Sequence, residues 1–383
     1  MKLLYVASDQ VVPGTTGGSV HVLEVARGLA RLGHEVHAVV RDTGAAPARE
    51  EREGVHWHRV RWTPPHRFFR FRARPAVEAI ADAVRPQAVM ERYYNFGGEG
   101  IFTAEARGLP SLLEVNSPLL DHRRSLKAAL DAALLVRPLR RRRERLCRAA
   151  SALVAPLLEI VPAFARGKTR RVTWGADVEA FHPRRRDPGR RAAWGVPEGA
   201  LAVVFAGSFR PWHGVHVLEE AARRLAHRHD IFFLLAGPAA AGPGPGYLGR
   251  RLGPLRYEEM PALLASCDVG VAPYDTRRLA QLELGFFWSP LKIFEYMASG
   301  LPTVTIGRPP LDEIVREGQE GLHVAEADPA ALAAALERLA DDAALRTAMG
   351  ARARARVVEL YSWQRHCQEL QELLAEIVAG GAR

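Results

Sequence analysis

The sequence predicts an α/β protein with two doubly wound domains, because one supersecondary pattern occurs twice along the chain. Residues 3–40 read as an apolar strand, a loop rich in glycine and threonine, an amphipathic helix and a second strand, and residues 201–236 repeat this order. A chain of 383 residues is also too long for one ordinary core. Ligands of doubly wound sheets bind beyond the carboxyl ends of the strands, so we expect the active site in a cleft between two facing domains.

The individual elements follow from apolar runs and the glycines that close them. The first repeat is read as a strand at 3–7, a loop at 8–18, a helix at 19–32 and a strand at 35–40. The second is read as a strand at 201–206, a loop at 207–214, a helix at 215–227 and a strand at 231–236.

The expected domain boundaries follow from the restart of the pattern. Between the repeats, residues 182–191 are polar, rich in arginine and interrupted by proline, which is typical of a linker. We therefore expect an N-terminal domain at 1–183, a linker at 184–200, a C-terminal domain at 201–362 and a last helix at 363–383.

Composition excludes several classes of protein. The chain is 48% hydrophobic and 25% charged, as globular proteins are. No apolar run approaches the ~20 residues of a membrane-spanning helix, and the N-terminus lacks the shape of a cleavable signal, so we expect a cytoplasmic protein. Three cysteines, odd in number and far apart, indicate neither a disulfide framework nor a zinc site.

The net charge of +10 is concentrated in the N-terminal half. Residues 1–186 hold 32 Lys and Arg against 19 Asp and Glu, a balance of +13, whereas the remainder has a balance of −3. Residues 66–74 interleave arginine with phenylalanine, and residues 137–146 form an arginine run, which suits a protein peripheral to an anionic membrane surface. A solvated, arginine-biased face is the alternative. We expect no nucleic-acid partner.

The stretch from residue 289 to 300 carries the most chemical information. Ser289 is expected as the N-cap of a helix, Pro290 as its first residue and Gly300 as its stop. Lys292 then lies in the first turn, where a cation opposes the helix dipole, which indicates an anionic ligand in front of it. Free amides, the dipole and the ammonium would hold a phosphate or diphosphate, and Glu295 on the same face could accept hydrogen bonds from sugar hydroxyls. An exposed lysine on a surface helix is the alternative.

The chain lacks the usual metal clamp for a diphosphate. No Asp-x-Asp and no P-loop pattern occur in it. Lys292, Arg210 and helix N-termini are therefore expected to stabilise a departing diphosphate without a metal ion or other cofactor. The tight loop at Gly17 and Gly18 opens the first helix and would approach the donor closely, with a plain strand-to-helix turn as the alternative.

Several motifs in order give the chain a family resemblance. It is similar to the retaining nucleotide-sugar glycosyltransferases of family four, the group 1 type with GT-B architecture, in which two Rossmann-like domains face each other. The resemblance covers nearly the whole chain and rests on residues 17–22, 33–36, 175–177, 181–183, 207–214, 267–274, 289–300 and 361–363.

The resemblance implies roles for particular residues. Lys292 would bind the donor diphosphate, Glu295 the nucleotide ribose, and the last helix would return to the first domain. The product would keep the anomeric configuration, with the leaving phosphate taking the acceptor proton and no protein nucleophile. Together with the reasoning above, Lys292 and Arg210 are expected as the catalytic residues. The expected donor-binding residues are Glu295, Gly17, Gly18, Gly207, Ser208, His213, Phe287, Trp288, Ser289, Pro290 and Leu291.

The chain departs from the family pattern at three of these positions. Ser208 replaces the usual arginine, and His213 replaces the usual lysine, so Arg210 is expected to reach the diphosphate, with His213 as a helper if it is protonated. Phe287 stands where the family has a glutamate that contacts the donor sugar, and Glu283 is out of register. Sugar recognition would then rely on backbone around residues 285–288.

The acceptor is expected to meet polar groups at the ends of two predicted strands. Asn116 is the preferred contact and Glu91 the next, each with a structural hydrogen-bonding role as an equal alternative. The histidine pairs at 56/58 and 227/229 are interpreted as surface residues rather than a metal site.

Three functions remain open at this point. The favoured one transfers a hexose-type sugar from a nucleotide sugar to a glycan, lipid-linked or small-molecule acceptor. The alternatives are a nucleotide-sugar epimerase of the same fold and a catalytically silent module that binds sugar nucleotides or membranes.

Overall fold

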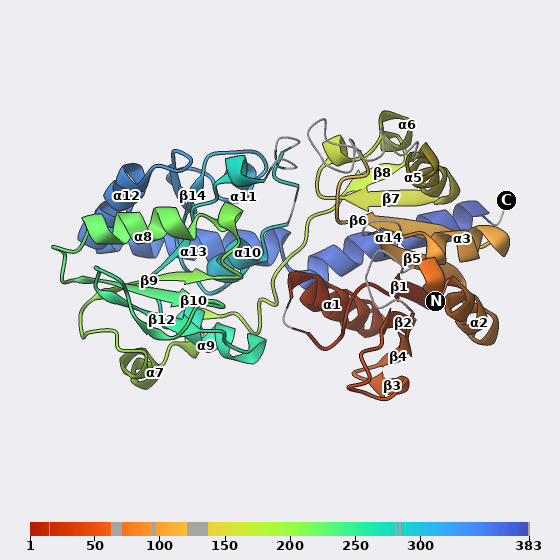
Figure 1. The fold of residues 1–383 in the computed structure, drawn as a ribbon, viewed down its shortest axis with the longest axis horizontal. Helices are drawn as coiled ribbons and strands as arrows, with labels where there is room; N and C mark the ends of the chain where they lie inside the picture. Colours follow the sequence, from red (N-terminus) through yellow and green to blue (C-terminus); the bar gives the residue numbers. More distant parts are fainter. Residues whose placement is uncertain are drawn as a thin grey trace. The chain divides into compact units, whose positions relative to one another are not determined.

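The structure, a computed structural model, forms two compact units (Figure 1). It describes residues 1–14, 16–62, 71–93, 97–120, 137–279, 282, 285–287 and 289–381. The first unit comprises Met1–Trp174, Phe287–Ser289 and Trp363–Arg383, and the second comprises Gly175–Phe286 and Pro290–Ser362.

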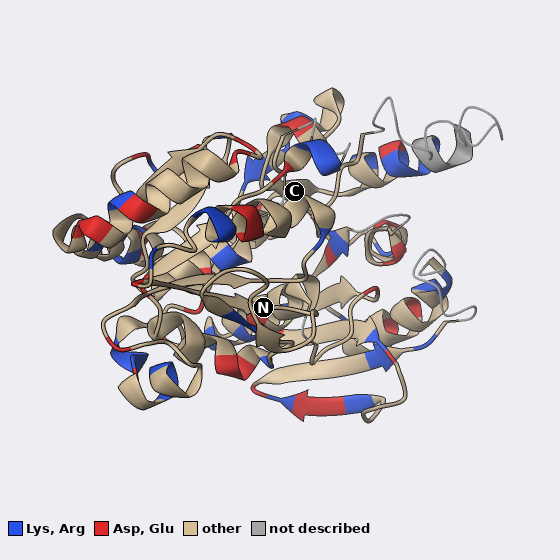
Figure 2. Cartoon of the chain, turned by 60° about the vertical axis from the view of Figure 1, so that its left-hand side comes forward, with Lys and Arg blue, Asp and Glu red and all other residues tan. Residues whose placement is uncertain are grey.

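The first unit is built on a mostly parallel sheet with the strand order β3-β4-β2-β1-β5-β6-β7-β8. Within the described residues only the edge strand β3 runs antiparallel to its neighbour, and its Arg-Glu-Glu-Arg sequence shows both signs of charge in Figure 2. The strands are β1 (Lys2–Ala7), β2 (Glu35–Arg41), β3 (Arg49–Arg52), β4 (Val55–Val60), β5 (Ala88–Tyr93), β6 (Ser111–Val115), β7 (Ala152–Ala155) and β8 (Thr169–Arg171).

Helices cover this sheet, and the first of them starts where its sequence allows a cap. Thr16 accepts a hydrogen bond from the Ser19 amide, so α1 begins at Gly17, two residues before the expected start. Further along, α14 packs against α1, and a Cβ on Gly28 of α1 would overlap the Sγ atom of Cys367. The helices are α1 (Gly17–Arg31), α2 (Arg74–Val84), α3 (Glu99–Ala106), α5 (Arg137–Ala149), α6 (Ala163–Arg166) and α14 (Trp363–Gly381).

The second unit repeats the architecture with the strand order β11-β12-β10-β9-β13-β14-β15. Its core packs the apolar strands β9 and β10 against α8 and α12 through residues such as Phe205, Leu218 and Leu336. The strands are β9 (Leu201–Ala206), β10 (Ile231–Ala236), β11 (Gly242–Pro243), β12 (Gly249–Gly253), β13 (Val269–Ala272), β14 (Thr303–Ile306) and β15 (Gly321–Val324). The helices are α7 (Pro188–Ala193), α8 (Val215–Arg224), α9 (Met260–Ala265), α10 (Leu291–Ala298), α11 (Leu311–Ile314), α12 (Pro329–Asp341) and α13 (Ala343–Leu360).

The boundary between the units differs from the expected one. The second unit begins at Gly175, so residues 175–183, which we expected in the N-terminal domain, belong to it. The expected linker is also structured, because it contains α7 and its Arg186 and Arg191 both form ion pairs with Asp268. These ion pairs anchor the segment to the second unit.

Two observations bear on the expectations from composition. Cys147, Cys267 and Cys367 are free and buried. Among the helices that the structure describes, none is both long and apolar enough to span a bilayer.

Candidate functional site

The helix that carries Lys292 starts later than its sequence suggests. Helix α10 begins at Leu291, with Pro290 as an N-cap that makes no side-chain capping bond. The hydroxyl of Ser289 accepts a hydrogen bond from the backbone amide of Trp174 at 3.1 Å within the first unit. The expectation of Ser289 as N-cap and Pro290 as first helical residue is therefore wrong, because a tertiary contact uses the hydroxyl. Lys292 is the second residue of the helix.

The ammonium group of Lys292 is enclosed by aromatic rings. Its Nζ atom lies 4.0 Å from the centroid of Phe205 and 5.5 Å from that of Tyr274. Nζ is buried and has no hydrogen-bond partner among the described residues. Burial lowers the pKa of Lys292 to about 7, although Glu295 acts to raise it. The alternative of an exposed surface lysine does not fit this environment.

Gly207, at the carboxyl end of β9, allows the lysine to approach the backbone. A Cβ at this position would lie 2.8 Å from Lys292 Nζ and 3.5 Å from His213 Nδ1. Gly207 also has a φ of +153°, which side chains disfavour. The loop after β9, the side chain of His213 and the ammonium therefore meet at one end of the sheet.

The other residues of this loop divide into exposed and buried groups. Ser208 and Arg210 are exposed, whereas His213 is buried and its Nδ1 has no partner among the described residues. Burial, with the charges of Lys292 and Arg210, lowers the pKa of His213 to about 2. A pKa this low disfavours the protonated imidazole on which the expected helper role of His213 depends.

Glu295 lies one turn after Lys292 on α10. Its Oε1 accepts a hydrogen bond of 3.0 Å from the hydroxyl of Tyr257. Burial raises the pKa of Glu295 to about 7, against the opposing effects of Tyr257 and Lys292. The side chain can thus present either a protonated or an ionised carboxyl group to a ligand near neutral pH.

An aromatic cluster lines the same region of the second unit. The rings of Trp212 and Tyr274 are stacked with centroids 5.8 Å apart, and Phe286 lies 4.5 Å from Tyr274. The adjacent Phe287 is buried and belongs to the first unit. Trp288 and Glu283, also considered from the sequence, lie outside the described residues.

In the first unit, the two glycines at the start of α1 pack against polar groups of the protein. Gly17 is the first residue of the helix. A Cβ on Gly18 would overlap the side chain of Gln10 and would lie 3.1 Å from a guanidinium nitrogen of Arg92. Arg92 in turn forms a buried ion pair of 2.9 Å with Asp9. Close packing within the unit is sufficient to explain Gly18.

The two expected acceptor contacts make intramolecular hydrogen bonds. Both carboxylate oxygens of Glu91 accept from backbone amides at the start of α3, those of Gly98, Gly100 and Ile101. Asn116 is buried and donates a bond of 3.3 Å to the carbonyl of Glu114. The contacts of Glu91 are thus those of a structural hydrogen-bonding residue, the alternative to an acceptor contact.

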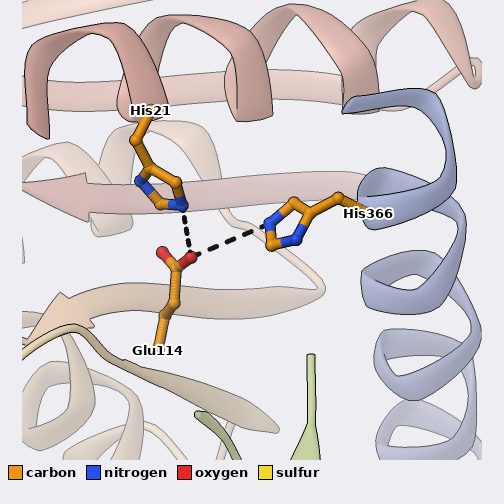
Figure 3. A group of neighbouring side chains, drawn as sticks. All are labelled: His21, Glu114 and His366. Atoms are coloured by element: carbon orange, nitrogen blue, oxygen red, sulfur yellow. Dashed lines mark ion pairs between the residues drawn. The ribbon is translucent and has the colours of Figure 1, made fainter. Parts of the chain in front are cut away.

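A buried cluster in the first unit, which no sequence pattern predicted, consists of His21, Glu114 and His366 (Figure 3). Burial lowers the pKa values of both histidines, that of His366 to about 4. Burial acts to raise the pKa of Glu114, but His21, His366 and Arg92 outweigh it and hold that pKa at about 2. No local motif joins the three residues, so no sequence pattern could have found them.

Of the histidines interpreted from the sequence as surface residues, those at 56 and 58 contact a third histidine, whereas His227 is exposed. His58 contacts His37 of the neighbouring strand through an Nε2–Nδ1 distance of 3.0 Å, and the ring of His56 stacks on that of His37. His37 Nε2 lies 3.0 Å from Glu35, which makes Glu35, His37 and His56 a second, partly exposed cluster. His227 is exposed and contacts the carbonyl of Arg224.

The chain is similar to known glycosyltransferases over most of its length. The family model described as glycosyl transferases group 1 matches residues 200–342, and the glycosyl transferase 4-like domain matches residues 16–171. A D-inositol 3-phosphate glycosyltransferase of Salinispora tropica is 28% identical over 416 residues, which cover 96% of this chain and 83% of that protein.

Solved structures share the fold. Sucrose-phosphate synthase from Thermosynechococcus elongatus has a TM-score of 0.76 at 18% identity and covers 99% of both chains. Anabaena HepE in complex with UDP-glucose has a TM-score of 0.71 at 17% identity over 98% of this chain and 100% of that chain. The two doubly wound sheets are therefore those of the GT-B fold, as predicted. With both family models matched in order along it, the chain belongs to the group 1 glycosyltransferases, of the family-four type.

Proposed function

We propose that this glycosyltransferase takes a hexose-type sugar from a nucleotide-sugar donor and transfers it with retention of configuration. The donor diphosphate binds at the N-terminus of α10 and the loop after β9. One observation carries the proposal: Lys292 places a buried ammonium, without a hydrogen-bond partner among the described residues, beside Gly207. Burying a polar group without a partner is costly, and an anionic ligand would supply the partner.

The charges of the second unit suit a departing nucleoside diphosphate. Lys292 stands in the first turn of α10, where helix amides and the helix dipole also favour an anion. Arg210 is exposed in the loop after β9 and can add a second cation. In this proposal fixed cations stabilise the leaving group and no metal ion acts in the transfer.

Glu295 is assigned to the nucleotide ribose. Its carboxyl group is already oriented by the hydroxyl of Tyr257, and an oriented carboxylate can accept two hydrogen bonds from neighbouring sugar hydroxyls. The solved complex of Anabaena HepE with UDP-glucose supports a nucleoside-diphosphate sugar as the donor.

Retention is assigned to attack on the same face of the sugar. The leaving phosphate takes the proton of the acceptor hydroxyl as the new glycosidic bond forms, so no protein nucleophile is required. The acceptor is a glycan, a lipid-linked group or a small molecule. The D-inositol 3-phosphate glycosyltransferase relatives favour a small polar acceptor, and because the relatives are transferases, an epimerase or a silent binding module is not favoured.

The basic N-terminal half adds a proposed location at the inner face of a membrane. On α5, Arg141, Arg145 and Arg148 are exposed and lie at spacings that suit an anionic lipid surface. Sedimentation with anionic liposomes at low and high salt tests this part, because electrostatic binding must weaken as salt increases.

The donor site is tested by calorimetry with UDP-glucose and other nucleotide sugars, after a thermal-shift panel has identified the donor that stabilises the protein most. Lys292→Met keeps the apolar stem and removes the ammonium, so donor affinity should fall at least ~10-fold. Arg250→Met, which removes an exposed cation of the same unit, is the matched control. Unchanged donor affinity in Lys292→Met would overturn the assignment. Transfer of labelled sugar to an added acceptor tests the reaction itself.

A further inference from the structure

Three side chains from distant parts of the chain converge in the interior of the first unit. His21 comes from α1, Glu114 from β6 and His366 from α14, and Figure 3 shows the three pointing toward one another. His21 Nε2 lies 2.6 Å from Glu114 Oε1, and His366 Nε2 lies 3.8 Å from the same oxygen. Their relative exposures are 0%, 3% and 3%, so the group is closed to solvent.

The hydrogen bonds around the cluster fix the tautomer of His366. Its Nδ1 lies 2.8 Å from the backbone carbonyl of Thr173. A carbonyl only accepts, so Nδ1 carries the hydrogen and Nε2 of the neutral ring is a bare lone pair. This lone pair faces Glu114 Oε1, which is also an acceptor, and His366 Nε2 is among the buried atoms without a hydrogen-bond partner in the described chain. His21 Nε2 and Glu114 Oε1 are likewise buried without a hydrogen-bond partner among the described residues, and one bound cation would satisfy all three atoms.

The three facing atoms lie close enough together to share one metal ion. Around one zinc ion with bonds of about 2.0–2.1 Å, tetrahedral ligand atoms lie about 3.4 Å apart. The two observed separations, 2.6 Å and 3.8 Å, lie on either side of this value. The three ligand atoms all lie within 4.8 Å of one another. Small side-chain rotations would therefore suffice for coordination.

The surroundings supply the groups that usually orient metal ligands. The second ring nitrogen of a histidine ligand commonly donates a hydrogen bond to a carbonyl, as His366 Nδ1 does to the carbonyl of Thr173. The free oxygen of the carboxylate, Glu114 Oε2, accepts a hydrogen bond of 3.2 Å from the hydroxyl of Tyr5. The ring of His21 is stacked on Trp174 with centroids 4.3 Å apart, which fixes its orientation.

We propose that His21, Glu114 and His366 bind one divalent transition-metal ion, with zinc the cation that two imidazoles and a carboxylate suit best. The ion joins α1, β6 and α14 and acts structurally. It takes no part in the sugar transfer, which we propose to proceed without a metal ion.

The test uses the whole protein and the metal ions alone. Protein stripped with a chelator is titrated with CoCl₂, which gives a visible absorption band in a nitrogen and oxygen site, and with ZnCl₂, which is followed by thermal unfolding. The wild type should bind one equivalent at the buried site, and zinc should raise its melting temperature. Tyr5→Phe leaves the three ligands intact but removes an orienting hydroxyl, so affinity should fall about 10–100-fold.

Variants separate this site from the partly exposed cluster of Glu35, His37 and His56. His366→Gln should abolish the cobalt band and the zinc-induced shift, whereas His56→Gln should leave both unchanged. If His366→Gln does not fold, His21→Gln and the wild-type titration serve as the test. The proposal is overturned if stripped wild-type protein binds no cobalt, or if the bound equivalent survives in His366→Gln and disappears in His56→Gln.

Discussion

The Nζ atom of Lys292 lies over the ring of Phe205, 4.0 Å from its centroid, in a part of the second unit where no hydrogen-bond acceptor of the described chain reaches it. The face of an aromatic ring stabilises a cation by about 0.5–2 kcal/mol. This is less than the cost of burying the ammonium, so the pKa of Lys292 falls to about 7. The lysine thus gains most of its stabilisation only when an anion arrives.

Donor affinity should therefore depend on pH. A bound diphosphate favours protonated Lys292, so binding is strongest below pH 7 and weakens as the pH rises above the pKa of about 7 of the free enzyme. The loss should approach ~10-fold per pH unit between pH 7.5 and 9, measured by calorimetry with a nucleotide sugar, whose diphosphate does not titrate there.

Lys292→Arg is the control for this pH dependence. Arginine stays charged over the whole range, so the variant should bind with an affinity that is nearly constant between pH 7.5 and 9. If the same loss of affinity persisted in Lys292→Arg, Lys292 would not be the group whose titration weakens donor binding.

Gly207→Ala should damage donor binding more than it damages the fold. The new methyl group would lie 2.8 Å from Lys292 Nζ, and the backbone conformation there disfavours a side chain. We expect a loss of donor affinity of at least ~10-fold, because a small misplacement of binding groups is costly. Gly242→Ala, whose methyl group would meet nothing within 4 Å, should bind donor normally.

Glu91→Gln should lower stability without a specific effect on the acceptor. The substitution places an amide donor against backbone amides that now bond to the carboxylate, which should cost about 1–3 kcal/mol in urea unfolding. Glu105→Gln on α3 removes only an exposed ion pair with Arg145 and should change stability by less than about 0.5 kcal/mol. A raised KM for the acceptor with unaltered stability would show that Glu91 contacts the acceptor after all.

Gly28→Ala should loosen the packing of α14 on α1. A Cβ there would overlap Cys367, and overpacking of this kind costs about 1–3 kcal/mol. Adding Cys367→Ala should recover part of the loss, since it removes the opposing atom. Gly167→Ala, whose new methyl group would meet nothing within 4 Å, is the control. If the stability changes of Gly28→Ala and Cys367→Ala were additive in the double variant, the contact between these two residues would be contradicted.

The sequence predicted the parts of the site that follow from local rules. Strand β9 has the predicted bounds, and because parallel strands end at one edge of a sheet, the loop at Gly207 and Lys292 of α10 meet there. The fold class needed only the repeated strand–helix–strand pattern.

The remaining features depend on tertiary contacts that no local pattern records. The hydroxyl of Ser289 looked like a helix cap but is used by the amide of Trp174. His213 looked like a substitute cation, yet its burial and the neighbouring cations lower its pKa. The cluster of His21, Glu114 and His366 comes from three separate segments, so it becomes visible only when the chain is folded.

The position of α14 has a consequence for how the protein is made. This helix belongs to the first unit but follows the whole second unit along the chain. A ribosome therefore completes residues 175–362 before it supplies the helix that packs against α1. We expect the second unit to fold during synthesis, while the first waits with the α1 surface uncovered until its final helix emerges. Removal of residues 363–383 should thus leave the α1 surface uncovered and cause aggregation through it.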